Sequence, residues 1–112
     1  MIQSKRVCII GAGPSGIAAA KNCVQAGLEV VVFEKNDKVG GNWVFNSSTG
    51  HSSVYENTHI ISSKALSEFE DFPMPDDHPD YPSQLQLQAY FEAYTKHFGA
   101  YSKIRFKHVV NK

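Results

Sequence analysis

Arg6-Val7-Cys8-Ile9-Ile10-Gly11-Ala12-Gly13-Pro14-Ser15-Gly16 carries the strongest structural signal in this sequence of 112 residues. Its first half is a β-branched apolar run, which is typical of a buried strand. An alanine-rich helix is expected from Ile17 to Ala26, with Gly27 ending it. A second buried strand is expected from Glu29 to Phe33, ending at Glu34. This order predicts an α/β fold: a Rossmann-like βαβ unit with a parallel sheet.

The three glycines of this stretch have separate expected functions. Gly11 permits the tight turn that leaves the strand, and Gly13 lets a phosphate group approach the backbone closely. Gly16 lets the helix pack near the strand. The first N–H groups of the helix and its dipole favour an anion at the same place. The loop therefore predicts a dinucleotide site, and the alternative is a plain strand-to-helix turn.

Glu34 stands at the end of the second predicted strand. A carboxylate at this point can accept hydrogen bonds from the ribose hydroxyls of an adenosine. It disfavours a 2′-phosphate by like-charge repulsion, which leaves FAD or NAD(H). A solvated glutamate at a strand end is the alternative interpretation.

A second glycine pair follows in Gly40-Gly41-Asn42-Trp43. A glycine pair just after an acidic strand end, followed by an aromatic residue, resembles the second fingerprint of flavoproteins that bind two dinucleotides. The resemblance implies a backbone that can pass close to a flavin pyrophosphate or ribityl chain. An ordinary glycine turn is the alternative, but together with the first loop the pair favours FAD.

The segment from Phe69 to Pro82 has four prolines, which exclude a helix or a central strand. We expect a surface loop braced by Phe69, Phe72 and Tyr81. It also holds His78 among several acidic residues, which is interpreted as a solvated turn and not as a metal site.

The remainder of the chain predicts one more helix and one more strand. Ser83 and Gln86 have the spacing of a capping box. The helix that follows has a stripe of core-facing residues, and Gly99 ends it. A third strand is expected from Ile104 to Val110, at an edge of the sheet or with one face half-exposed. The stripe consists of Leu87, Phe91, Tyr94 and Phe98.

Composition excludes several classes of protein. Eleven Lys and Arg residues balance eleven Asp and Glu residues, so the basic excess of a nucleic-acid surface is missing. No apolar run approaches the length of a membrane span, and the first residues are not typical of a secretory signal. Cys8 and Cys23 match no zinc motif and are expected to be buried thiols of a cytoplasmic protein.

Taken together, these segments resemble the N-terminal part of a flavin-containing monooxygenase. The likeness covers nearly the whole chain, and it includes Phe69-Glu70-Asp71-Phe72-Pro73-Met74-Pro75-Asp76-Asp77 besides the glycine motifs. It implies that the first glycine loop and Glu34 hold the adenosine diphosphate half of FAD, with Lys35 beside the adenosine and Asn42 and Trp43 along the ribityl chain. No catalytic side chain and no metal ligand is expected. The expected cofactor-binding residues are Gly11, Ala12, Gly13, Pro14, Ser15, Gly16, Glu34, Lys35, Gly41, Asn42, Trp43 and Ser62.

The resemblance implies an enzyme that uses FAD and NADPH to transfer oxygen from O2 to a soft nitrogen or sulfur nucleophile. One position departs from the family pattern: Ile61 precedes Ser62-Ser63-Lys64, where many members have an asparagine near the reactive face of the flavin. An aliphatic side chain donates no hydrogen bond. An oxidase or reductase built on the same FAD half is therefore an alternative activity.

The NADPH motifs of the family do not occur in these residues. We therefore interpret residues 1–112 as the N-terminal portion of an FAD-binding domain, without the NADPH domain. Another chain, or the rest of the protein, is then expected to complete the sheet. A truncated, non-catalytic dinucleotide-binding or interaction fragment is the alternative.

Overall fold

A computed structural model of the protein describes residues 5–45, 58–60 and 63–111. It contains one sheet of three parallel strands in the order β1-β2-β3. The predicted α/β class with a parallel sheet is therefore confirmed. In chain order the elements are β1 (Arg6–Ile10), α1 (Pro14–Gln25), β2 (Glu29–Glu34), η1 (Gly41–Trp43), α2 (Lys64–Ser67), α3 (Gln84–His97), η2 (Tyr101–Lys103) and β3 (Ile104–Phe106).

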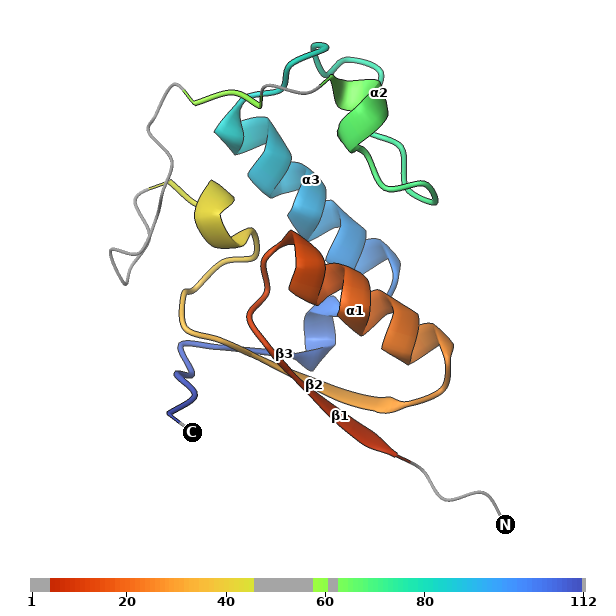
Figure 1. Ribbon diagram of the computed structural model, residues 1–112, viewed down its shortest axis with the longest axis vertical. Helices are drawn as coiled ribbons and strands as arrows, with labels where there is room; N and C mark the ends of the chain where they lie inside the picture. Colours follow the sequence, from red (N-terminus) through yellow and green to blue (C-terminus); the bar gives the residue numbers. More distant parts are fainter. Residues whose placement is uncertain (1–4, 46–57, 61–62, 112) are drawn as a thin grey trace.

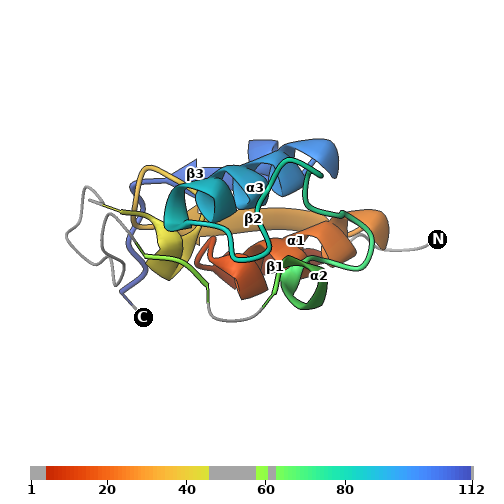
Figure 2. The ribbon, with the colours of Figure 1, turned by 90° about the horizontal axis from the view of Figure 1, so that it is seen from above.

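The two long helices, α1 and α3, lie on the same face of the sheet (Figures 1 and 2). Both connections run in the same direction across the sheet, and right-handed crossovers then put their helices on one side. The side chains between these layers form the core. Its central members include Ile17, Ala20, Val32, Leu87, Phe91 and Tyr94.

The first βαβ unit agrees with the sequence prediction at both strands, but α1 begins at Pro14, three residues before the expected start. Proline is favoured at the first helical position because its missing N–H would have no partner there. The Ile17 N–H donates to the Gly13 carbonyl oxygen, with N and O 3.0 Å apart. The helix ends at Gln25, and Gly27 follows with a φ of +79°.

The helix α3 begins with the predicted capping box. The Gln86 N–H donates to Ser83 Oγ, and the Ser83 N–H donates to Gln86 Oε1 at 3.0 Å. The stripe residues Leu87, Phe91 and Tyr94 are buried, while Phe98 follows the helix as its C-cap and is half-buried. The register of α3 against the sheet is thus set by a cap at one end and by core packing along its length.

The third strand, β3, is shorter than predicted. It pairs with β2 from Ile104 to Phe106, where the expectation extended to Val110. Lys107 has a φ of +58°, which an extended strand cannot accommodate. As predicted, β3 is an edge strand of this sheet.

Two of the three predicted braces hold the proline-rich loop. The rings of Phe69 and Phe72 pack against Tyr94, with ring centroids 4.2 and 5.7 Å apart. The Phe69 N–H donates to Tyr90 Oη at 2.8 Å, and that hydroxyl donates to the Phe72 carbonyl oxygen. The prediction for Tyr81 is wrong, because this residue is 54% exposed beside the turn that leads into α3.

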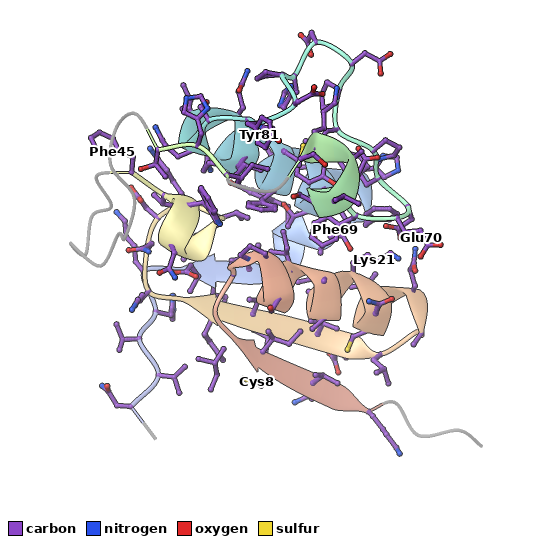
Figure 3. All side chains as sticks on the ribbon, turned by 45° about the horizontal axis from the view of Figure 1, so that its top comes forward. Cys8, Lys21, Phe45, Phe69, Glu70 and Tyr81 are labelled. Atoms are coloured by element: carbon purple, nitrogen blue, oxygen red, sulfur yellow. The ribbon has the colours of Figure 1, made fainter. Side chains whose placement is uncertain are left out.

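The opposite face of the sheet is uncovered in the described part of the chain. Cys8 points away from both helices (Figure 3) and is exposed, as is Ile10, so the prediction that Cys8 is buried is wrong. No described helix packs on this side, and β-strand side chains alternate between the faces. An open hollow of about 760 Å³ lies here, lined by residues that include Val31, Phe33 and Arg105.

Two further features concern the described ranges alone. No helix in them is long and apolar enough to cross a membrane. No group of three or more His, Cys, Asp or Glu side chains in them is arranged to hold a metal ion.

Candidate functional site

The two glycine segments and Glu34 meet at the carboxyl ends of β1 and β2. The first segment leaves β1 and leads into α1, while the second follows β2 and contains η1. In open parallel sheets, ligands bind beyond the carboxyl ends of the strands. The topology therefore brings the two glycine segments and Glu34 together at one end of the sheet.

Gly11 and Gly16 have the structural roles that the sequence predicted. Gly11 has a φ of +99°, and its N–H donates to the Phe33 carbonyl oxygen at 2.8 Å. A methyl group on Gly16 would lie 2.0 Å from the Gly11 carbonyl oxygen, far inside van der Waals contact. The helix α1 can therefore lie this close to β1 only with glycine at position 16.

The two glycine segments are in direct backbone contact. A Cβ atom on Gly41 would lie 3.0 Å from the Gly13 Cα atom, and Gly41 has a φ of +58°. The Gly40 N–H donates to the Ala12 carbonyl oxygen at 3.0 Å, with Gly40 at a φ of +133°. These conformations favour glycine at both positions of the pair.

The carboxylate of Glu34 is buried at the centre of the site, with 3% of the residue exposed. Its Oε1 atom accepts the Ala12 N–H, and its Oε2 atom accepts the Asn36 N–H, both at 2.7 Å. The interpretation of Glu34 as a solvated strand end is therefore wrong. A carboxylate has about four acceptor positions, so these two bonds leave capacity for hydroxyl donors.

The N-terminus of α1 supplies hydrogen-bond donors next to this carboxylate. The first hydrogen bond within the helix comes from the Ile17 N–H, so the N–H groups of Ser15 and Gly16 precede it and have no partner inside the helix. Ser15 is exposed and Gly13 carries no side chain. The backbone here can therefore approach an anionic group, and the helix dipole favours that charge.

The other predicted site residues lie around this centre. Lys35 and Asn42 are exposed, while Trp43 is half-buried and packs against the core. Ser62 and Ile61 lie outside the described residues.

Sequence reasoning did not identify Gln88 on α3, which contacts the second glycine segment. Its Nε2 atom donates to the Val39 carbonyl oxygen at 3.0 Å, across 49 residues of chain. Its Cγ atom lies 3.3 Å from the place where a Cβ on Gly40 would stand. No motif marks this glutamine, since only the folded chain brings α3 beside the second glycine segment.

Comparison with known proteins shows the family of the chain. The sequence model of the flavin-binding monooxygenase-like family matches residues 4–112. The chain belongs to this family. Its likeness to flavin-containing monooxygenases, predicted from the motifs, is thereby confirmed.

Individual relatives in the flavin-binding monooxygenase-like family match nearly all of the chain. Flavin-containing monooxygenase 5 of Oryctolagus cuniculus is 44% identical over 97% of it, and flavin-containing monooxygenase 1 of Homo sapiens is 41% identical over 94%. These matches cover 21% and 20% of the relatives, so the chain spans about a fifth of their length.

Solved structures of monooxygenases share the fold. S-allyl-L-cysteine S-oxygenase from Allium sativum superposes with a TM-score of 0.83 at 23% identity, over 94% of this chain and 28% of that one. An oxidized steroid monooxygenase bound to NADP superposes with a TM-score of 0.78 at 25% identity, over 95% of this chain and 20% of that one. Another neighbour is a complex with FAD and NADP. The family model is described as flavin-binding, and FAD and NADP, the two cofactors predicted from the sequence, occur together in this last neighbour.

Proposed function

We propose that this chain is the FAD-binding portion of an NADPH-dependent monooxygenase. The observation that carries the proposal is the contact of the two glycine segments, Gly13 against Gly41, directly beside the buried carboxylate of Glu34. Bare backbone, helix N–H groups and a carboxylate are the groups that a dinucleotide needs at its pyrophosphate and its ribose.

The residues fit FAD in the following way. The loop from Gly11 to Gly16 and the first N–H groups of α1 hold the pyrophosphate, and Glu34 accepts the ribose hydroxyls. Lys35 lies beside the adenosine. The second segment lies along the ribityl chain, with Gly41, Asn42 and Trp43 as its binding residues, and Ser62 completes the proposed set.

For the whole protein we propose oxygenation of small molecules with a soft nitrogen or sulfur nucleophile. A bound flavin supplies the redox chemistry, with NADPH as the reductant and O2 as the source of the oxygen atom. The described residues position the cofactor, and no catalytic side chain is assigned to them. Both described cysteines are free thiols, which suits the reducing cytoplasm that we propose as the location.

A titration with FAD tests this function. Gly13→Ala is the decisive variant, because its Cβ would lie 3.6 Å from the Gly41 Cα atom, an ordinary contact that leaves the fold intact. The added methyl group would still obstruct the approach of a phosphate. We expect the wild-type chain to quench FAD fluorescence saturably, Gly13→Ala to bind at least about tenfold more weakly, and the exposed-site control Gln25→Ala to match the wild type.

Two results would count against this proposal. One is a wild-type chain that does not bind FAD at all. The other is a Gly13→Ala variant that binds FAD as tightly as the wild type while unfolding at the same denaturant concentration.

The uncovered face of the sheet favours a second role, docking of another polypeptide. Apolar and cationic side chains, among them Val31, Phe33 and Arg105, line this face away from the glycine segments. We propose that another part of a longer protein, or another chain, completes the sheet and thereby also shields this face. A non-catalytic interaction fragment would pair through the open edge of the sheet and would bind FAD weakly or not at all, so the titration separates the two roles.

A further inference from the structure

The second glycine segment is held from two sides. On one side the Gly40 N–H donates to the Ala12 carbonyl oxygen, which ties the segment to the first glycine loop. On the other side the Gln88 side chain donates to the Val39 carbonyl oxygen. Val39 is 1% exposed, so water cannot easily replace the Gln88 side chain. If this donor were removed, the buried Val39 carbonyl oxygen would lose this hydrogen bond, which is costly.

Gln88 also limits where the segment can lie. Its Cγ and Cβ atoms stand 3.3 and 3.9 Å from the position of a Cβ on Gly40, so its aliphatic stem packs directly against the glycine backbone. A hydrogen bond at the tip and a contact along the stem together define one position for the Val39–Gly40 peptide.

The helix that presents Gln88 is itself fixed. Leu87 and Phe91, on either side of Gln88 in the sequence, are buried in the core and hold this part of α3 in place. Gln88 therefore projects from a rigid element, which is the condition for placing a loop to within a fraction of an ångström.

A continuous set of contacts runs from α3 to the proposed ribose carboxylate. Gln88 bonds the Val39–Gly40 peptide, Gly40 bonds Ala12, and the Ala12 N–H bonds Glu34. A displacement of the second glycine segment would therefore also move the first glycine loop and the Glu34 carboxylate that is bonded to it.

We propose that Gln88 is a positioning residue for the FAD site, which sets the second glycine segment at the distance that the cofactor needs. This inference rests on the proposed function for its ligand. It assigns a role in cofactor binding to a helix that lies outside both glycine motifs.

The test compares two glutamines of the same helix. Gln88→Met keeps the length of the side chain but removes the donor, whereas Gln86→Met weakens the capping box and leaves the glycine contact intact. We expect Gln88→Met to bind FAD about tenfold more weakly, the factor that the loss of one hydrogen bond represents. Gln86→Met should bind within about twofold of the wild type although it unfolds more easily.

A second measurement needs no cofactor. Hydrogen exchange of the Gly40 N–H reports how well the segment is held against Ala12. We expect this exchange to be several-fold faster in Gln88→Met than in Gln86→Met when the two variants are matched for global stability. Gln88→Lys supplies a different donor for the Val39 carbonyl oxygen. The Gly40 N–H should therefore exchange more slowly in Gln88→Lys than in Gln88→Met.

Failure of the proposed function can be distinguished from failure of the inference about Gln88. If the wild-type chain binds no FAD, the proposed function fails for this chain, and exchange at Gly40 then decides whether Gln88 positions the segment. Equal losses of FAD affinity in the Gln88 and Gln86 variants would overturn the inference, because a stability effect would then explain both. So would unchanged exchange at Gly40 in Gln88→Met.

Discussion

Gly13 and Gly41 touch through their backbones, although they belong to different loops at the ends of different strands. A Cβ atom on Gly41 would stand 3.0 Å from the Gly13 Cα atom, closer than side chains normally approach. We expect Gly41→Ala to push the two segments apart and to weaken FAD binding more than it weakens the fold. Calorimetric titration with FAD, compared with urea unfolding, measures the two effects separately, and an unchanged affinity would contradict the expectation.

Gly16→Ala should damage the fold itself. Its methyl group would meet the Gly11 carbonyl oxygen at 2.0 Å, and rigid backbone cannot yield as a flexible side chain can. Overpacking of this kind costs about 1–3 kcal/mol of unfolding free energy. Ser15→Ala is the matched control, since Ser15 is its exposed neighbour in α1, and its unfolding free energy should stay within about 0.5 kcal/mol of the wild type. Equal urea midpoints for the two variants would show that α1 can shift away from β1.

Glu34→Gln replaces one acceptor oxygen by an amide NH2 group. One of the two backbone N–H groups, of Ala12 or of Asn36, would then face a donor in a buried place. We expect a loss of about 1–3 kcal/mol in unfolding free energy. Glu29→Gln is the control, because the ion pair of Glu29 with Arg6 is exposed and contributes about 1 kcal/mol or less. The prediction fails if both variants unfold at the same denaturant concentration.

Alkaline pH should loosen the proline-rich loop. Burial raises the pKa of Tyr90 to about 12, from 10.0 in an unfolded chain, and burial also raises the pKa of Tyr94. A raised pKa stabilises the fold below pH 10, and this stabilisation is lost as the pH rises from about 10 to about 12. Urea unfolding across this range should show a decline that is smaller in Tyr90→Phe. Tyr81→Phe, at an exposed site, should decline like the wild type.

Acid should weaken the link between α1 and the same loop. Lys21 is buried and pairs with Asp71, and Figure 3 shows it reaching from α1 toward the turn that carries Phe69 and Glu70. The hydrogen bond from Lys21 lowers the pKa of Asp71 below its usual 3.8. The pair therefore stabilises the fold at pH values above 3.8, the pKa of Asp71 in the unfolded chain. This stabilisation is lost as the pH falls through the lowered pKa of the folded state. Asp71→Asn should reduce the acid dependence of unfolding, whereas Asp77→Asn, at an exposed side chain, should not.

The uncovered face of the sheet can be probed through its thiol. Cys8 is exposed on this face, while Cys23 on α1 is half-buried. In the isolated chain, Cys23→Ser, which retains Cys8, should react with a thiol reagent several-fold faster than Cys8→Ser does. Protection of Cys8 by a bound polypeptide would support docking on this face, and equal rates for the two variants would show that the face is already covered.

The sequence was sufficient where local chemistry determines the structure. The βαβ unit follows from apolar runs and from glycines, since Gly11 and Gly16 occupy positions that exclude other residues. The start of α3 follows from Ser83 and Gln86, whose side chains satisfy backbone groups only a few residues away. The convergence of Glu34 and the glycine loop follows from the rule that parallel strands end at one edge.

The errors and omissions arise where distant residues determine the result. Gln88 meets Val39 only when α3 docks beside the second glycine segment, and no pattern in the sequence specifies that contact. Cys8 has the apolar neighbours of a buried residue, but its side of the strand is uncovered. Tyr81 belongs to the same loop as Phe69 and Phe72, but it is exposed while their rings pack on α3. The surroundings of each of these residues depend on which distant element packs against it. The spacing of apolar residues in the sequence does not specify that element.

The strand register also implies an order of assembly. Arg6 in β1 and Glu29 in β2 pair across 23 residues, whereas Val32 in β2 and Ile104 in β3 pair across about three times that length of chain. The shorter loop costs less entropy to close, so β1, α1 and β2 should come together first and form the first glycine loop early in folding. The arrival of α3 would then complete the second segment, which makes competence for cofactor binding a late event on the folding pathway.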